Sequence, residues 1–159
     1  MATITAQLTV SSDITDYGLA INKTMTMSKA GATTGLDRTS GVQRVYLANL
    51  NHVDLIKGGL ANTSVEDMTL SAAAKVYIKY LEDDTAKFVR IGLGNAADGT
   101  TQTANNGDAT FFEMGRLYGN EWMIIPWSGA SNVGDITVQP SVATAADKAI
   151  VEYIVFFED

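Results

Sequence analysis

Few side chains of this sequence could take part in catalysis, and they are scattered along the chain. Its 159 residues include no cysteine and a single histidine, His52. These counts exclude thiol catalysis, cysteine-ligated zinc or iron–sulfur sites, and any metal site that needs two histidines. Asp54 follows His52 by two residues and could orient its imidazole, but no G-x-S-x-G motif supplies a nucleophile. We therefore expect His52 to be structural and predict no catalytic residue and no enzymatic activity.

One glycine motif could bind a nucleotide cofactor. Gly92, Gly94 and Ala97 match the relaxed dinucleotide pattern G-x-G-x-x-A and follow a predicted strand. A bound pyrophosphate would also need a helix to begin at this point, so that its amides and dipole face the phosphates. Residues 98–101 instead read Asp-Gly-Thr-Thr, which favours a turn. The motif therefore predicts no cofactor.

The carboxylates are also distributed as turn residues. Calcium prefers a dense series of oxygen ligands, and only a loose version of such a series occurs at Asn95, Asp98 and residues 105–108. The acidic run at residues 82–84 has the composition of a hairpin turn between two strands. We expect these side chains to be solvated and predict no metal site.

The charge balance argues against nucleic acid and membrane partners. Eleven Lys and Arg residues face eighteen Asp and Glu residues, which gives a net charge of −7. The basic residues are scattered, whereas a nucleic-acid binder or an anionic-membrane binder would show a basic face. The start of the sequence lacks the pattern of a signal peptide, and no apolar stretch approaches the ~20 residues of a membrane helix. We expect a soluble protein made in a cytoplasm.

The dominant pattern along the chain has period two, as in half-buried β-strands. Residues 3–10, for example, place Ile, Ala, Leu and Val on one side and mainly threonine on the other. Comparable patterns predict nine strands, over residues 3–10, 19–27, 42–50, 74–81, 88–93, 109–114, 122–125, 136–138 and 149–157.

These strands predict an all-β fold of a single domain, residues 1–159. The sequence supports at most one short helix, at Ser64–Ser71, and two long polar loops, at residues 29–41 and 94–108. Nine strands with apolar faces require two sheets packed face to face. The sequence therefore predicts a two-sheet β-sandwich, with a jelly roll as the first choice and an immunoglobulin-like sandwich as the nearest alternative.

Large apolar side chains on strands and in polar loops are candidates for subunit contacts. Phe156 and Phe157 point to opposite faces of one strand, so one of the two rings is expected to leave the main core. Because exposed apolar surface marks interfaces, we predict candidate assembly contacts at Ile4, Leu8, Met25, Met27, Leu36, Trp127 and Phe156. Sugar binding by exposed aromatic rings remains an alternative.

The C-terminal third resembles small virion proteins of tailed bacteriophages. Gly119, Glu121 and Pro126 lie in a strand of the G-E-x-x-x-x-P type, residues 135–138 form a D-I-x-V strand, and residues 151–153 form part of a final V-E-Y strand. In the proteins that these segments resemble, the three strands complete a jelly roll. The resemblance covers about 40 residues of pattern, and the N-terminal half contributes nothing specific to it.

The resemblance implies a non-enzymatic structural component of a phage particle. Its first implication is a capsid-decorating (cement) protein that forms a homotrimer and binds the major capsid protein on the virion surface. Such proteins often contact neighbouring capsid subunits through an N-terminal arm, for which residues 1–12 are the candidate here. A tail, baseplate or fibre component and a carbohydrate-binding β-sandwich module are the alternatives.

Overall fold

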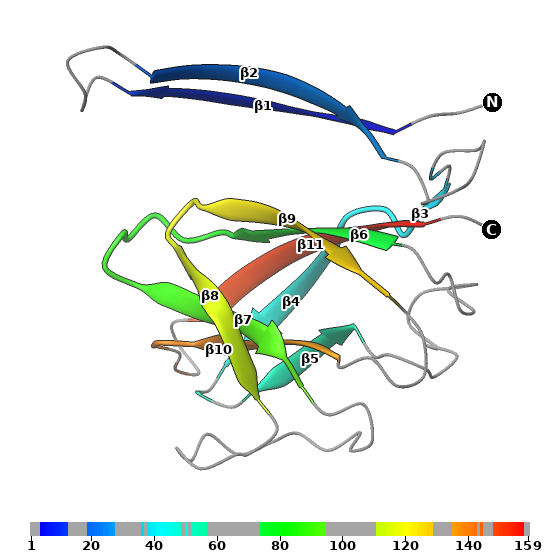
Figure 1. Ribbon diagram of the computed structural model, residues 1–159. Helices are drawn as coiled ribbons and strands as arrows, with labels where there is room; N and C mark the ends of the chain where they lie inside the picture. Colours follow the sequence, from blue (N-terminus) through cyan, green and yellow to red (C-terminus); the bar gives the residue numbers. More distant parts are fainter. Residues whose placement is uncertain are drawn as a thin grey trace.

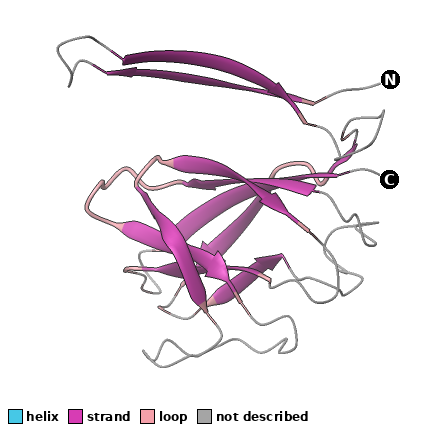
Figure 2. Ribbon diagram, viewed as in Figure 1, coloured by secondary structure: helices cyan, strands magenta, loops and turns pink. Residues whose placement is uncertain are grey.

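The structure is a computed structural model, which describes most of the predicted strands and part of the connections. The described residues are 4–12, 19–27, 36, 38–48, 50, 52–56, 74–94, 111–128, 135–142, 144 and 148–157. Within these ranges the chain forms strands and loops without a helix (Figure 2). The all-β prediction is thus confirmed. The short helix predicted at Ser64–Ser71 lies outside the described residues.

Eleven strands occur in the described part of the chain (Figure 1). They are β1 (Thr5–Ser12), β2 (Leu19–Thr26), β3 (Arg38–Thr39), β4 (Gln43–Leu47), β5 (Val53–Ile56), β6 (Ala74–Tyr80), β7 (Phe88–Leu93), β8 (Phe112–Tyr118), β9 (Trp122–Trp127), β10 (Ile136–Pro140) and β11 (Ala149–Phe157).

Strands β4 to β11 form two antiparallel sheets with the topology of a jelly roll. One sheet has the order β4-β11-β6-β9, with β3 pairing beyond β4 along the same edge of β11, and the other has the order β5-β10-β7-β8. Strand β4 pairs with β11, β5 with β10, β6 with β9, and β7 with β8. This nested pairing results when one long antiparallel hairpin rolls up into two facing sheets, which is the jelly-roll arrangement. The predicted sandwich is confirmed.

The core lies between the inner faces of the two sheets. Alternate residues of β6 and β11 are buried along the whole of each strand, from Ala74 to Tyr80 and from Ala149 to Phe157. They meet Val89 and Ile91 of β7 from the opposite sheet in one continuous cluster of buried side chains. Strict alternation in the sequence therefore reflects strands with one apolar face inward.

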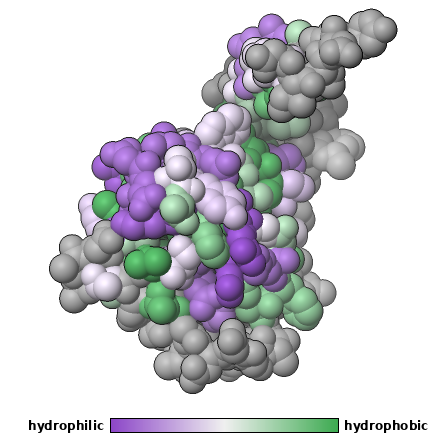
Figure 3. Space-filling model, turned by 90° about the vertical axis from the view of Figure 1, so that its left-hand side faces the viewer, coloured by the Kyte–Doolittle hydropathy of each residue, from purple (hydrophilic) through white to green (hydrophobic). Residues whose placement is uncertain are grey.

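Strands β1 and β2 form a separate two-stranded antiparallel sheet, which we call the N-terminal hairpin. Figure 1 shows it apart from the sandwich, on the side of β6, β9 and β11. In the perpendicular view of Figure 3 the same part of the chain forms a protrusion above a rounder body. None of its residues belongs to the core cluster.

Three of the observed strands, β3, β5 and β8, differ from the sequence prediction. The short strands β3 and β5 were not predicted, because two and four residues are too few to show alternation. Strand β8 runs to Tyr118 although its predicted end is Met114. A bulge in the β7–β8 pairing leaves Met114 without a partner in the register, and the extra residue interrupts the period-two pattern.

The acidic run at residues 82–84 is not a hairpin turn, so this expectation is corrected. β6 and β7 belong to different sheets, and the segment between them crosses from one sheet to the other. Both strands have a clear period-two pattern, and a direct turn between them was the simplest interpretation of the sequence. The pattern of a strand carries no information on which sheet it joins.

Candidate functional site

The N-terminal hairpin is the most distinctive surface of the molecule. Eight residue pairs join its strands, from Thr5 opposite Thr26 to Ser12 opposite Leu19. Since directly opposed residues share a face of an antiparallel pair, the register separates the hairpin into two chemically different faces.

One face is polar and the other is largely apolar. The polar face carries mainly threonine, together with Gln7 and Asn22, whose side chains form a 3.0 Å hydrogen bond. The apolar face, which we call the apolar row, comprises the described side chains of Ala6, Leu8, Val10, Ile21 and Met25, with Lys23 among them.

The apolar row is not covered by the sandwich. Leu8, Ile21 and Met25 are 46%, 37% and 47% exposed. A two-stranded hairpin is at best marginally stable in water unless a further strand or layer packs on it. The hairpin therefore has the properties of an element that becomes covered on binding a partner.

The base of the hairpin is fixed by backbone hydrogen bonds. The N–H of Met27 donates to the carbonyl of Ile4 at 2.9 Å, and the N–H of Leu36 donates to the carbonyl of Met27 at 3.0 Å. Met27 and Leu36 are buried, and Ile4 is half-buried. Of the candidate contacts on this part of the chain, Leu8 and Met25 are therefore accessible to a partner, whereas Met27 and Leu36 anchor the base.

The two remaining candidate contacts lie on opposite faces of the five-stranded sheet. Trp127 pairs with Ala74 and belongs to the buried core, so it presents no surface to a partner. Phe156 is half-buried on the outer face of the sheet.

The outer face of this sheet carries aromatic residues that the list of candidate contacts missed. The rings of Tyr77 and Trp122 lie 6.1 Å apart, and Trp122 is 49% exposed. Ile124 and Ile154 flank Tyr77 on the neighbouring strands. The sequence contained the information needed to place these rings on the outer face. Tyr77 alternates with the inward residues of its strand, and Trp122 and Trp127 are five residues apart, so their side chains face opposite sides of the sheet.

The outer face of the four-stranded sheet combines charged residues with a second aromatic pair, Phe88 and Tyr118, whose ring centres lie 5.5 Å apart. Glu113 pairs with Arg116 at 2.8 Å and with Arg90 at 3.5 Å. The hydrogen bond that Arg116 donates to Glu113 raises the pKa of Arg116, whose guanidinium also lies 4.7 Å from the ring centre of Phe88. This face thus carries more ion pairs than the outer face of the five-stranded sheet, but it also exposes the ring of Tyr118 (40%).

A small group of polar residues is buried at one end of the four-stranded sheet. The hydroxyl of Thr137 donates to Oδ1 of Asp54 at 2.8 Å, and His52 stacks on Phe111 with ring centres 4.4 Å apart. Asp54 thus accepts from Thr137, the residue beside it on β10. The structural role of His52 stays a prediction.

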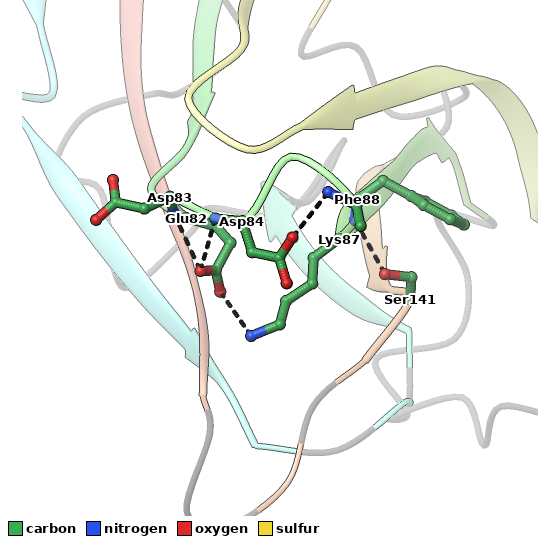
Figure 4. A network of polar contacts seen from close by, with 7 residues as sticks. Glu82, Asp83, Asp84, Lys87, Phe88 and Ser141 are labelled. Atoms are coloured by element: carbon green, nitrogen blue, oxygen red, sulfur yellow. Dashed lines mark hydrogen bonds and ion pairs between the residues drawn. The ribbon is translucent and has the colours of Figure 1, made fainter.

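The acidic run at residues 82–84 forms hydrogen bonds within its own connection (Figure 4). Oε1 of Glu82 accepts from the backbone N–H groups of Asp83 and Asp84 at 3.1 and 3.2 Å, and Oε2 lies 3.3 Å from Nζ of Lys87. The hydroxyl of Ser141 accepts from the N–H of Phe88 at 2.9 Å.

Among the described residues, no three acidic or histidine side chains form a group that could hold a metal ion.

Comparison of the chain with protein-family models and with curated proteins finds no match. In the part of the chain that the structure describes, no helix has the length and apolarity needed to cross a membrane. Function must therefore be argued from the exposed hairpin and the sheet faces.

Proposed function

We propose that this protein is a non-enzymatic structural component of a bacteriophage particle, which binds and stabilises the capsid surface as a decoration protein. The observation that carries the proposal is the N-terminal hairpin, whose apolar row is exposed beside a closed jelly roll. An exposed apolar ribbon on an otherwise well-packed domain favours a role in assembly.

Further support comes from the sequence. The C-terminal strands resemble small phage virion proteins, and jelly rolls are frequent among viral capsid components. The proposed partners are further copies of this chain, as a homotrimer, and the major capsid protein. The proposed location is the virion, after synthesis in the host cytoplasm.

The proposal predicts binding to capsids that lack the protein. Purified protein would be mixed with shells assembled from the major capsid protein of the same phage and then sedimented. We expect saturable co-sedimentation with the full chain and at least a tenfold loss of affinity when residues 1–26 are deleted. A full-length protein that stays in the supernatant at all concentrations would contradict the proposal.

A tail, baseplate or fibre component remains the nearest alternative, since such proteins use similar sandwiches. Binding to purified tails but not to capsids would favour it.

The ring pair Tyr77–Trp122 favours a second candidate function, carbohydrate binding. Exposed aromatic rings on a sheet face can stack on sugar rings, and lectins also use jelly rolls. A glycan array probed with the full chain and with Trp122→Ala tests this function, with Tyr46→Ala as an exposed aromatic control. Trp127→Ala would be uninformative, because this ring belongs to the core.

A further inference from the structure

The proposed function leaves open what covers the apolar row of the hairpin. Leu8, Ile21 and Met25 keep 37–47% of their surface exposed in the single chain. The row therefore needs a flat apolar partner of similar length.

The outer face of the five-stranded sheet has this character. We call it the outer sheet face; its apolar members are Tyr46, Tyr77, Trp122, Ile124, Ile150, Ile154 and Phe156. Cross-strand pairs place Ile124, Tyr77 and Ile154 in one line across three strands. The aliphatic stems of Lys75 and Lys79 extend this surface, as long lysine side chains commonly do.

We infer that the apolar row of one copy packs against the outer sheet face of a second copy. Two sheet faces that pack in this way lie about 10 Å apart and bury their facing side chains between them. Lys23 lies in the middle of the row, and Glu152 provides a carboxylate on the sheet face, where it now pairs with Arg44 at 2.9 Å. The inference deepens the proposed function and rests on it, since it names the partner of the same hairpin.

The area of the contact supports a second copy as the occupant. An eight-residue strand is about 26 Å long, and a two-stranded ribbon about 10 Å wide covers roughly 250 Å² on each partner. When three copies of a homotrimer each give one hairpin and receive one, three such contacts remove about 1,500 Å² in total, which exceeds the roughly 1,000 Å² that a specific interface needs. A single hairpin lying on an unrelated partner would reach only a third of this area.

The first test uses matched charge substitutions on the two faces of the hairpin. Leu8→Asp places a carboxylate in the apolar row, and Thr9→Asp places one on the polar face at the next residue. By light scattering we expect the unmodified chain and Thr9→Asp to have the mass of an oligomer, and Leu8→Asp to have the mass of a monomer. A monomeric unmodified chain, or equal masses for both variants, would overturn the inference.

The second test identifies the docking surface and does not depend on the folding of an aspartate variant. Because the natural chain has no cysteine, disulfides can form only at introduced sites. Tagged Met25→Cys protein would be mixed with untagged Trp122→Cys protein and oxidised. Met114→Cys serves as the control partner, since Met114 is as exposed as Met25 (47%) but lies on β8 of the other sheet.

We expect mixed disulfides with Trp122→Cys at least fivefold more often than with Met114→Cys. Equal yields would refute the proposed surface. A chain that carries both Met25→Cys and Trp122→Cys and closes a disulfide within itself would show that the hairpin covers its own sheet, and would also refute it. Neither test contains a capsid, so a failure here is distinct from a failure of capsid binding.

Discussion

At the scale of single residues, Gly92 on the four-stranded sheet is a position where close packing leaves no room for a side chain. A Cβ atom there would clash with the carbonyl oxygen of Phe112 and would lie 2.6 Å from the ring of Phe111. The same ring stacks on His52. A side chain at Gly92 would therefore push against backbone as well as against the ring that covers it.

Gly92→Ala is expected to destabilise the protein by about 1–3 kcal/mol, the usual cost of forcing an extra methyl into a packed site. Gly115→Ala is the matched control, because it lies on the adjacent strand with nothing within 4 Å of its Cβ position. Alanine there should be neutral or stabilising, since glycine is unfavourable within strands. Urea unfolding of both variants measures the difference, and equal losses would contradict the packing argument.

Two tyrosines link stability to alkaline pH. Burial raises the pKa of Tyr153, and burial together with the negative charge of Glu152 raises the pKa of Tyr77. Because the folded-state pKa exceeds the unfolded value of about 10, the folded state retains its protons longer. Stability should be unaffected by these groups below pH 10 and should fall as the pH rises further.

Tyr153→Phe keeps the buried ring and removes the ionising group. We expect the loss of unfolding free energy between pH 9 and pH 11.5 to be smaller in this variant than in the natural chain. Thermal unfolding over this range provides the measurement, with Tyr46→Phe as a control for removing an exposed hydroxyl. An unchanged pH profile would exclude Tyr153 as a source of the dependence.

At the scale of elements, the hairpin and the sandwich do not share a core. Every residue of the core cluster lies on β4 to β11, and backbone hydrogen bonds join Met27, at the base of the hairpin, to Ile4 and Leu36. The hairpin should therefore contribute to assembly rather than to the stability of the sandwich.

Deletion of residues 1–26 is expected to leave a chain that unfolds cooperatively, with a Tm within about 3 °C of the natural chain when both are monomeric. Circular dichroism should retain the strand signal of the sandwich. Loss of the cooperative transition would show that the hairpin is part of the folding unit.

The elements also show which parts of the fold could be predicted from the sequence. The period-two pattern identified β6 and β11, whose inward residues are all buried and whose outward residues are half-buried. Pairing partners could not be predicted, since the sheet that β7 joins depends on contacts far away in the chain. Among the candidate contacts, Leu8 and Met25 are exposed, and their role in assembly stays a prediction. The choice between Trp127 and Trp122 required knowledge of which face of β9 meets the core.

At the scale of the whole molecule, the described chain combines a closed sandwich with a hairpin that stands apart from it (Figure 1). Most of the hairpin's described side chains are exposed, and none belongs to the core cluster. An assembling subunit would bury such a surface against its neighbours.

Because the contact that we propose is mainly apolar, self-association should persist in salt. The mass measured by light scattering is expected to be the same at 0.05 M and 0.5 M NaCl, since screening weakens charge pairs but not apolar burial. Dissociation at 0.5 M NaCl would show that ion pairs, such as one between Lys23 and Glu152, supply most of the binding energy.

The topology also sets an order of events during folding. The hairpin pairs residues that are close in sequence, so it can form within microseconds. The sandwich must bring Leu47 to Ala149, about 100 residues along the chain, and such distant pairing is slow. The apolar ribbon can therefore form transiently before the sheet that is proposed to receive it. Lys23 in its apolar row and the threonines on its other face would act during that interval as gatekeepers against premature aggregation.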